Sequence, residues 1–280
     1  MARKALLIGV NKYLIPGADL RGCVNDIKTM RELLREFYGF QDQDIVTLQD
    51  ADATKLAIEE GYENLLKGAQ AGDVLYTHYS GHGSNVPDKS GDEADHRDEI
   101  LCPTNLDWKD PLTDDWLRHK FDTLPNGVNL TVVMDCCHSG SNTRELRPPD
   151  LAEMETRQRF LPCPLDLFAA ESGRALRGTV RGARQEYRAA EGDIKDVDIP
   201  ETLITGCRSD QTSADAYLEG DFRGALTYSL ANAIRETRGD LTYLQLHAAA
   251  STRLRGEFSQ VPQLEGRAAT LERNFLAPFK

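Results

Sequence analysis

The stretch that decides the fold is DVLYTHYSGHG at residues 73–83, where apolar and aromatic side chains lead into a turn with two glycines. Residues 73–79 have the length and composition of a buried strand. A second stretch, LTVVMDCCHSG at residues 130–140, is built in the same way, because apolar residues again run directly into polar ones. In parallel α/β sheets the active site lies beyond the carboxyl ends of the strands. The two stretches therefore predict strands whose ends carry a functional site.

The chain around these stretches alternates short apolar runs with amphipathic ones. Further strands are expected at residues 4–10, 45–48 and 202–207. Helices are expected at residues 25–37, 224–236 and 241–254, and another after Thr54, a favourable N-cap residue. Strands that alternate with helices indicate a mostly parallel central sheet covered on both faces. The predicted fold class is therefore α/β.

The character of the chain changes between residues 141 and 200. This region has little apolar periodicity, and it contains prolines and a set of arginines at positions 144, 147, 157, 159, 174, 177, 181, 184 and 188. Such a composition is typical of a segment that cannot bury a core of its own. We expect an exposed, Arg-rich insertion that is partly helical or disordered.

The overall charge narrows the class of partner. The chain has 280 residues, with 33 Lys and Arg against 45 Asp and Glu and a net charge of −12. Nucleic-acid binding needs a basic face to neutralise phosphates, and no such face is evident. The acidic balance argues against a nucleic-acid partner and favours a cationic substrate, although an acidic surface more often serves solubility alone.

The cysteines and the apolar runs indicate a cytoplasmic protein. The apolar run at residues 5–10 is too short for the core of a signal peptide, and no membrane partner is expected. The six cysteines are scattered at positions 23, 102, 136, 137, 163 and 207. This spacing is not that of a secreted disulfide framework, so reduced thiols are expected.

The polar clusters contain the parts of a thiol-based catalyst. A thiol nucleophile needs a base, donors for the oxyanion, and glycines that let the substrate backbone approach. Cys137 lies at a strand end, and His82 lies between Gly81 and Gly83 at another. A lone cysteine or histidine in such a place is more often structural, but their joint occurrence indicates a catalytic pair. Backbone N–H groups near Cys137 and Gly83 are expected to bind the oxyanion.

Four ordered motifs resemble those of the metacaspases, which are caspase-like cysteine peptidases. Their sequences are YSGHG at residues 79–83, DCCHSG at residues 135–140, GCVND at residues 22–26 and GCRSDQTSAD at residues 206–215. The resemblance spans the chain apart from the Arg-rich insertion. It implies a caspase-like fold with a large-subunit-like catalytic part at residues 1–140. Residues 141–200 would be the linker, and residues 201–280 a small-subunit-like part that completes the same domain.

The resemblance also assigns the two catalytic roles. It implies that Cys137 is the nucleophile and His82 the base, with His138 following the nucleophile without acting as its base. Cys136 remains an alternative nucleophile because it is adjacent in the sequence. His78 is interpreted as a core or hydrogen-bonded histidine. A zinc site made from the paired cysteines and the histidines is a weaker alternative, since adjacent cysteines lack the usual ligand spacing.

The substrate pocket is also assigned through the resemblance. It puts Cys23, Asp26, Ser80 and Asp135 around the residue that precedes the scissile bond. Two carboxylates in a partly desolvated pocket favour a protein or peptide substrate with Arg or Lys there, and bidentate pairing favours Arg. The alternative is that Asp26 only caps a helix and Asp135 only orients a loop. An Arg-directed or Lys-directed peptidase is expected, whereas true caspases cut after Asp.

No cofactor is required by this chemistry, but calcium is a candidate activator. Ten acidic residues lie between positions 88 and 115, and clustered oxygen ligands suit Ca²⁺. A solvated acidic loop is the plainer interpretation. The resemblance maps calcium ligands to Asp98, Asp114 and Asp115. Arg144 occupies a position where a further carboxylate is expected, and this difference should weaken the site.

The Arg-rich insertion has a second possible role if the pocket prefers arginine. We expect self-cleavage somewhere between Arg144 and Arg188, in an enzyme that acts as a monomer. The competing hypotheses are a paracaspase-like or clostripain-like peptidase with the same pair, and a non-catalytic caspase-like scaffold that binds partners. A nucleotide-binding domain is less favoured, because no phosphate-binding glycine loop follows the first strand.

Overall fold

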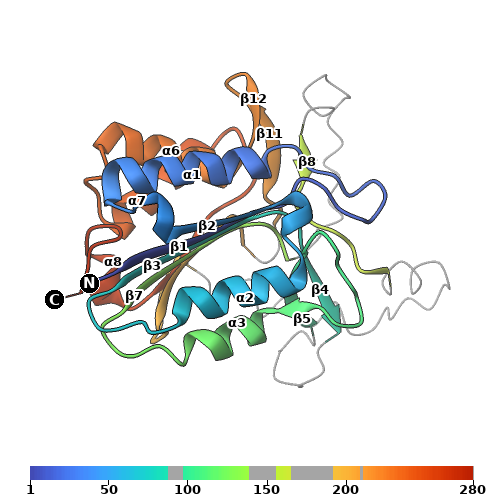
Figure 1. Ribbon diagram of the computed structural model, residues 1–280. Helices are drawn as coiled ribbons and strands as arrows, with labels where there is room; N and C mark the ends of the chain where they lie inside the picture. Colours follow the sequence, from blue (N-terminus) through green and yellow to red (C-terminus); the bar gives the residue numbers. More distant parts are fainter. Residues whose placement is uncertain (88–96, 139–155, 165–191, 209–210, 280) are drawn as a thin grey trace.

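The computed structural model describes residues 1–87, 97–138, 156–164, 192–208 and 211–279 (Figure 1). A seven-stranded sheet runs through its centre, with the strand order β2-β1-β3-β7-β10-β13-β9. Only the pairing of β10 with β13 is antiparallel. The strands are β1 (Arg3–Gly9), β2 (Ile45–Gln49), β3 (Val74–Ser80), β7 (Asn129–Asp135), β9 (Ile194–Asp196), β10 (Glu201–Thr205) and β13 (Gln263–Gly266). The predicted α/β class with a mostly parallel central sheet is confirmed.

Helices cover both faces of this sheet, as Figure 1 shows. One face carries α1 (Cys23–Tyr38), α6 (Ala225–Thr237) and α7 (Tyr243–Leu254), and the other carries α2 (Lys55–Leu66) and α3 (Asp114–Phe121). Because both faces are covered, side chains that alternate along β1 are buried on both sides, with Leu7 in one hydrophobic cluster and Leu6 in the other. This double burial explains why the strand is continuously apolar.

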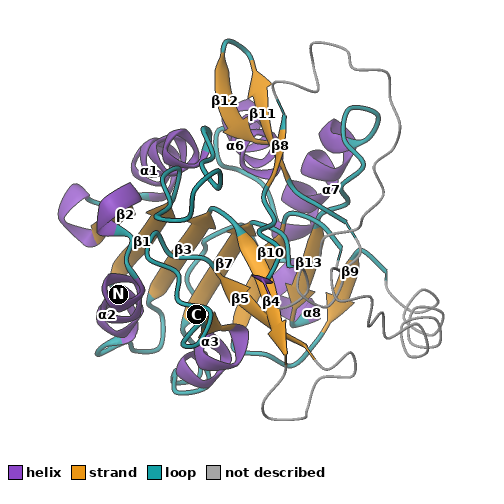
Figure 2. Ribbon diagram, turned by 90° about the vertical axis from the view of Figure 1, so that its right-hand side faces the viewer, coloured by secondary structure: helices purple, strands orange, loops and turns teal. Residues whose placement is uncertain are grey.

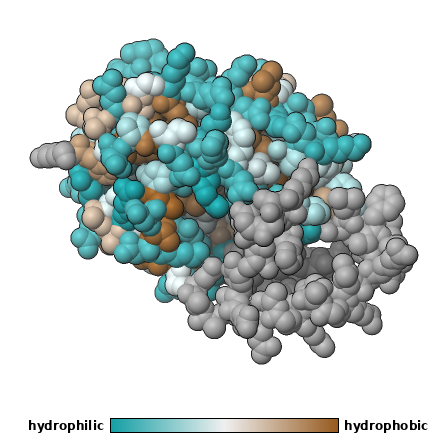
Figure 3. Space-filling model, turned by 90° about the horizontal axis from the view of Figure 1, so that it is seen from below, coloured by the Kyte–Doolittle hydropathy of each residue, from teal (hydrophilic) through white to brown (hydrophobic). Residues whose placement is uncertain are grey.

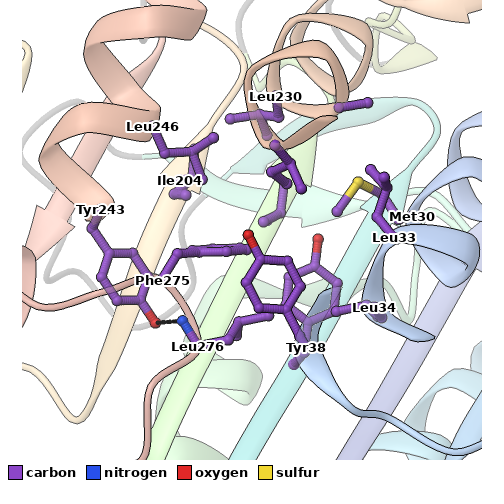
Figure 4. Close-up of a cluster of buried hydrophobic side chains, with 14 of the residues drawn as sticks. Met30, Leu33, Leu34, Tyr38, Ile204, Leu230, Tyr243, Leu246, Phe275 and Leu276 are labelled. Atoms are coloured by element: carbon purple, nitrogen blue, oxygen red, sulfur yellow. Dashed lines mark hydrogen bonds between the residues drawn. The ribbon is translucent and has the colours of Figure 1, made fainter. Parts of the chain in front are cut away.

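The larger hydrophobic cluster lies between the sheet and the helices α1, α6 and α7. Figure 4 shows aromatic and aliphatic side chains from these elements meeting there, with Tyr243 and Phe275 beside Ile204. The hydroxyl of Tyr243 accepts a hydrogen bond from the backbone N–H of Leu276 (3.3 Å), so the C-terminal segment is tied to α7. A short helix, α8 (Ala268–Leu271), precedes that segment.

The helix boundaries follow local chemistry that the sequence already contains. The side chain of Thr54 accepts a hydrogen bond from the backbone N–H of Ala57 (3.2 Å), which confirms the predicted start of α2. Thr242 and Gln245 form a capping box, and therefore α7 begins two residues later than expected. Two short 3-10 helices, η1 (Asp42–Asp44) and η2 (Asp50–Asp52), flank β2.

Two small sheets, which the sequence patterns did not predict, flank the carboxyl edge of the central sheet (Figures 1 and 2). One contains β4 (Gly83–Pro87), β5 (Arg97–Leu101) and β6 (Leu112–Thr113). The other contains β8 (Arg157–Gln158), β11 (Ala214–Leu218) and β12 (Asp221–Gly224). Glu219 and Gly220 join β11 to β12 and both have positive φ angles, as a tight hairpin turn requires. These sheets add a wall on each side of the site predicted at the strand ends.

The expected exposure of residues 141–200 is wrong for part of that region. In the described segment 156–164, the side chain of Arg159 is 0% exposed and Cys163 is 1% exposed. The physical reason is that this segment pairs with β11 and crosses the carboxyl edge of the sheet. Residues 141–155 and 165–191 lie outside the described part of the chain.

The described helices were compared with the length and apolar character that a membrane span requires. Among the helices that the structure describes, none combines the length and the apolar character needed to cross a membrane. On the face that carries α2 and α3, Figure 3 shows mostly hydrophilic residues with small hydrophobic patches between them.

Candidate active site

The two polar clusters predicted from the sequence meet at one edge of the sheet. Strands β3 and β7 are parallel neighbours, and their last residues, Ser80 and Asp135, are directly paired. His82 follows the end of β3, and Cys137 follows the end of β7. The strand pairing therefore brings the two stretches to the same place, as the position of active sites in parallel sheets requires.

His82 is held in one orientation by three contacts. The Nε2 atom lies 2.7 Å from the carbonyl oxygen of Ala18, the backbone N–H donates to the Tyr13 hydroxyl (2.7 Å), and the Tyr13 ring packs against the imidazole at 5.0 Å. A carbonyl oxygen can only accept, so the proton of the neutral ring is on Nε2. Nδ1 is then left as the basic atom, and it has no hydrogen-bond partner among the described residues.

Burial keeps the His82 ring neutral. The side chain is 5% exposed, and this burial is the largest cause that lowers its pKa to about 4. The hydrogen bond to the Ala18 carbonyl opposes the shift, while the charge of Arg159 adds to it. At neutral pH the ring is therefore available as a proton acceptor.

The adjacent cysteines face different surroundings. The Cys137 sulfur contacts the backbone N–H of Ser213 and lies 3.7 Å from its carbonyl oxygen. The Cys136 sulfur belongs to the hydrophobic cluster on the α2 side of the sheet and lies 3.5 Å from Nε2 of His138. Burial raises the pKa of the Cys136 thiol well above its usual range. Of the two alternatives, this geometry favours Cys137 as the nucleophile.

A segment of the chain itself lies across the strand ends as an extended peptide. Arg157 and Gln158 pair with β11 in antiparallel fashion, and the Arg159 N–H donates to the Ser213 carbonyl (3.0 Å). On the other side, the Leu161 N–H donates to the Gly83 carbonyl (3.0 Å). The backbone is therefore bonded on both sides of the Arg159–Phe160 peptide bond.

The carbonyl oxygen of Arg159 occupies the position expected for the oxyanion. It accepts hydrogen bonds from the backbone N–H groups of Gly83 (3.0 Å) and Cys137 (3.2 Å). Two N–H donors aimed at one carbonyl oxygen form the donor set that stabilises a tetrahedral intermediate. Gly83 has no space for a side chain, because a Cβ atom there would collide with the carbonyl group of Cys137.

The guanidinium group of Arg159 is fully buried among carboxylates. Its Nη2 atom lies 2.7 Å from Asp26 and 3.1 Å from Asp215. Its Nη1 atom lies 2.8 Å from the Ser80 hydroxyl and 3.2 Å from the Asp135 carboxylate. Charge-assisted contacts on both terminal nitrogens match the fork geometry of arginine.

The pocket carboxylates are fixed by the protein as well as by the guanidinium. Asp26 accepts from the Gly224 N–H (2.9 Å), and Asp135 accepts from the Thr227 N–H (2.9 Å) and hydroxyl (2.7 Å). Asp215 accepts from two consecutive backbone N–H groups near the start of α1. These bonds hold the carboxylates in position from the side of the protein, in addition to their contacts with the guanidinium.

Electrostatics inside the pocket depends on burial and on the single cation. Burial raises the pKa of Asp26 to about 6, while the Arg159 guanidinium opposes this shift. Burial likewise raises the pKa of the Cys23 thiol well above its usual range, again opposed by Arg159. Cys23 is therefore a neighbour of the charged group, but no direct hydrogen bond joins the two.

The sequence motifs found four of the residues around Arg159 and missed three others. Cys23, Asp26, Ser80 and Asp135 are brought together as expected. The residues that were missed are Ser213, Asp215 and Gly224. Asp215 ends the GCRSDQTSAD motif, so the signal was present in the sequence, although nothing in that motif indicated which acid would face the pocket.

The other predicted polar residues have mixed outcomes. His78 is a buried core histidine, as expected, and hydrogen-bonds the hydroxyls of Tyr76 (3.0 Å) and Thr227 (3.1 Å).

The calcium ligands remain a prediction. Asp98 is buried in β5, while Asp114 and Asp115 begin α3. Within the described ranges, no group of three or more His, Cys, Asp or Glu residues is arranged to hold a metal. Arg144 lies outside the described residues.

Comparisons with known proteins agree with this architecture. The family model for the metacaspase peptidase C14 domain matches residues 3–144. Metacaspase-1 of Pyricularia oryzae is 34% identical over 94% of this chain and 71% of its own length. Metacaspase-1B of Neosartorya fischeri is also 34% identical, over 94% of this chain and 68% of its own length. A crystal structure of a Geobacter sulfurreducens protein covers 100% of both chains with a TM-score of 0.70 and 25% identity.

The residue pair at the strand ends, the caspase-like sheet and the comparisons lead to one family. The matched model spans half of the chain, and the fungal relatives extend the similarity over the C-terminal part as well. Members of this family are cysteine-type peptidases. The chain belongs to the metacaspases, the peptidase C14 family of caspase-like hydrolases.

Proposed function

We propose that this metacaspase is an endopeptidase that cleaves after arginine, with Cys137 as nucleophile and His82 as general base and acid. The observation that carries this proposal is the position of Arg159. Its side chain lies among three carboxylates while its carbonyl oxygen accepts from the Gly83 and Cys137 N–H groups. A substrate arginine in the same place would present its scissile carbonyl to the Cys137 sulfur.

The chemical steps follow from the atoms at the site. Nδ1 of His82 takes the thiol proton, and the Cys137 sulfur attacks the carbonyl carbon of the substrate arginine. The Gly83 and Cys137 N–H groups stabilise the negative oxygen that forms. The imidazolium then protonates the leaving amine, and a thioester remains. Water, deprotonated by the same nitrogen, hydrolyses the thioester and restores the thiol.

The pocket contacts support a preference for arginine over lysine. The two terminal nitrogens of Arg159 reach different partners, Asp26 and Asp215 on one side and Ser80 and Asp135 on the other. A lysine ammonium is a single donor centre and cannot make both sets of contacts from one position. Lysine is therefore expected to be a poorer substrate residue that is still accepted, because the carboxylates favour any cation.

The arrangement of the resident segment also supports self-cleavage. The chain runs on through both sides of the Arg159–Phe160 bond, with β8 on one side and Leu161 bonded to Gly83 on the other. This is how an internal peptide bond, not a chain end, would be presented. Within the region from Arg144 to Arg188, we therefore propose the Arg159–Phe160 bond as the self-processing site.

The direct test uses fluorogenic peptides that end in Arg, Lys or Asp before the reporter group. We expect release in the order Arg, then Lys, with no turnover after Asp, and complete loss of turnover in Cys137→Ala. Cys136→Ala is the matched control, and it should keep most of the activity. Turnover after Asp, or an active Cys137→Ala enzyme, would overturn the proposal. Parallel assays with Ca²⁺ or a chelator test the calcium hypothesis separately.

We further propose that the protein acts in the cytoplasm as a monomer. All six cysteines are free thiols in the structure, which supports a reducing compartment. The molar mass in solution, measured by multi-angle light scattering under reducing conditions, tests the monomeric state.

A further inference from the structure

The residues that follow Arg159 differ in how far they are buried. Phe160 is half-buried, Leu161 is half-buried against the core, Pro162 is exposed and Cys163 is 1% exposed. Leu161 packs against the hydrophobic cluster on the α2 side and Cys163 belongs to a separate small cluster, whereas Phe160 packs against neither. The second and fourth residues after the Arg159–Phe160 bond are thus the ones whose side chains meet the apolar clusters of the enzyme body.

Leu161 is fixed by both its backbone and its side chain. Its N–H donates to the carbonyl of Gly83, and Phe160 forms a bridge with the same glycine. The Leu161 side chain packs against the hydrophobic cluster on the α2 side of the sheet. Because Gly83 also donates to the Arg159 carbonyl, one glycine sets the register of the arginine and of Leu161 together.

Cys163 fills a separate apolar site. It belongs to a small cluster with Val86 of β4 and Ile100 of β5, and Leu106 and Trp108 pack against the same cluster. A free cysteine in such surroundings behaves as a small hydrophobic residue. This site is built from the small sheet that begins at Gly83, and it has no part in the reaction at Cys137.

We infer that β4, β5 and the loop carrying Trp108 form a specificity surface for the departing side of the substrate. It selects an apolar residue at the second position after the scissile bond and a small apolar residue at the fourth. The inference rests on the proposed function, because it takes the resident segment as a template for substrates. In the structure, residues 160–163 of this chain lie on this surface. The substrates that we expect are peptides whose apolar residues have the same spacing.

The chemistry of the surface supports this selectivity. The fourth-position site is lined by aliphatic and aromatic side chains, and burying a carboxylate there without a partner is strongly unfavourable. Burial of one aliphatic side chain changes a binding constant by about tenfold or more. The departing side of the substrate should therefore matter to kcat/KM, and polar replacements should be rejected.

The test compares internally quenched peptides cut by the active full-length protein. The parent peptide carries residues 158–164, in which Arg159 is the single arginine, and its variants carry Leu161→Asp or Cys163→Asp. Each change is expected to lower kcat/KM by about tenfold. A third variant, Pro162→Asp, is the matched control, because Pro162 is exposed and the same charge there should change kcat/KM by less than about twofold.

A substitution in the enzyme tests the surface from the other side. Trp108→Ala should reduce the discrimination between the parent peptide and its Cys163→Asp variant, and leave the discrimination at Leu161 in place. Leu56→Ala, on an exposed position of α2, is the control variant and should preserve both ratios. Circular dichroism checks that each variant is folded.

A short fluorogenic substrate, which has arginine but no residues after the scissile bond, separates the two proposals. If this substrate is not cleaved, the proposed function fails. If it is cleaved but all four longer peptides have equal kcat/KM, the proposed function stands and the specificity surface is refuted. A loss for Pro162→Asp as large as for Leu161→Asp would also refute it, since the effect would then be general to negative charge.

Discussion

The two sides of the Arg159–Phe160 bond are bound by different physics. Before the bond, one guanidinium is enclosed by Asp26, Asp135 and Asp215 and by directed hydrogen bonds. After it, Leu161 and Cys163 lie against apolar clusters that contribute no charge contact. A buried charge without its partners is strongly disfavoured, whereas apolar contact is graded by area. The acidic side therefore accepts almost only cationic residues, whereas the apolar side changes kcat/KM by smaller, graded amounts.

The strongest way to break this comparison is to remove the resident cation. Arg159→Ala should abolish cleavage between residues 159 and 160, because alanine leaves the pocket carboxylates without a partner. Arg157→Ala is the matched control: Arg157 is exposed and only two residues away, and cleavage should continue. Intact mass and N-terminal sequencing detect the product that begins at Phe160.

Two further outcomes make this test decisive. Arg159→Lys should still be cut, at a lower rate, and it keeps a cation in the pocket in case the alanine variant is unstable. If instead the Arg159→Ala protein yields the same new N-terminus, or if Arg157→Ala alone blocks the cut, the assignment of the bond is wrong.

The second expected effect comes from the pocket itself. Asp215→Asn keeps the shape of the side chain and one of its two acceptor oxygens, but removes one charge beside the guanidinium. Breaking one contact of a buried ion pair costs about 3–5 kcal/mol, so kcat/KM for arginine peptides should fall by at least about a hundredfold. Asp221→Asn, on the exposed start of β12, is the control that keeps activity.

The third effect concerns arginine against lysine in otherwise identical peptides. Loss of one set of hydrogen bonds to charged groups corresponds to about 1.5–3 kcal/mol. The kcat/KM for the arginine peptide should therefore exceed that for the lysine peptide by at least about tenfold. In Asp215→Asn this preference should shrink, because one of the two contacted sides is weakened. Equal rates for the two residues in the unmodified enzyme would contradict the two-sided contact.

The smallest effect is a dependence on pH that only the acidic side should have. Asp26 has a pKa raised to about 6 by burial. As the pH falls through 6 it takes up a proton, loses its charge and binds the guanidinium less well. The expected result is a few-fold fall in kcat/KM between pH 7 and pH 5.5. The His82 ring, with a pKa lowered to about 4, stays neutral over this range.

Peptides that differ only by Leu161→Gly provide the comparison for that titration. Their ratio of kcat/KM should stay constant with pH, since no titrating group takes part in the apolar contact. Asp26→Asn should remove the fall in kcat/KM between pH 7 and pH 5.5 for arginine peptides. A fall that persists unchanged in Asp26→Asn would assign the titration to another group.

The central architecture was predictable because it depends on local patterns. Continuous apolar runs such as residues 5–8 occur in strands that are covered on both faces, and Thr54 caps its helix through its own side chain. The candidate pair was predictable because His82 and Cys137 lie where two strands end. The β11–β12 hairpin had a weaker signal, since Glu219-Gly220 is only one of several glycine-containing pairs.

Arg159 could not be predicted, for a different reason. It is one of nine arginines between residues 141 and 200, and no neighbour in the sequence distinguishes it. Its burial depends on Asp26, Asp135 and Asp215, which come from α1, the end of β7 and β11. Only the folded chain brings those three segments together. For the same reason, the composition of residues 141–200 predicted an exposed linker, whereas Arg159 is buried in the structure.

The tethering of Arg159 to its own pocket has a kinetic consequence. A peptide joined to its binding site by the chain is present at an effective concentration of roughly millimolar, whatever the dilution of the protein. If the Arg159–Phe160 bond is the first one cut, its cleavage is a unimolecular event, with a half-time that does not change with enzyme concentration. Free substrates at micromolar concentration would compete poorly for the pocket until that cleavage has occurred. The rate constant of this first cleavage would therefore set the time at which activity toward other substrates begins.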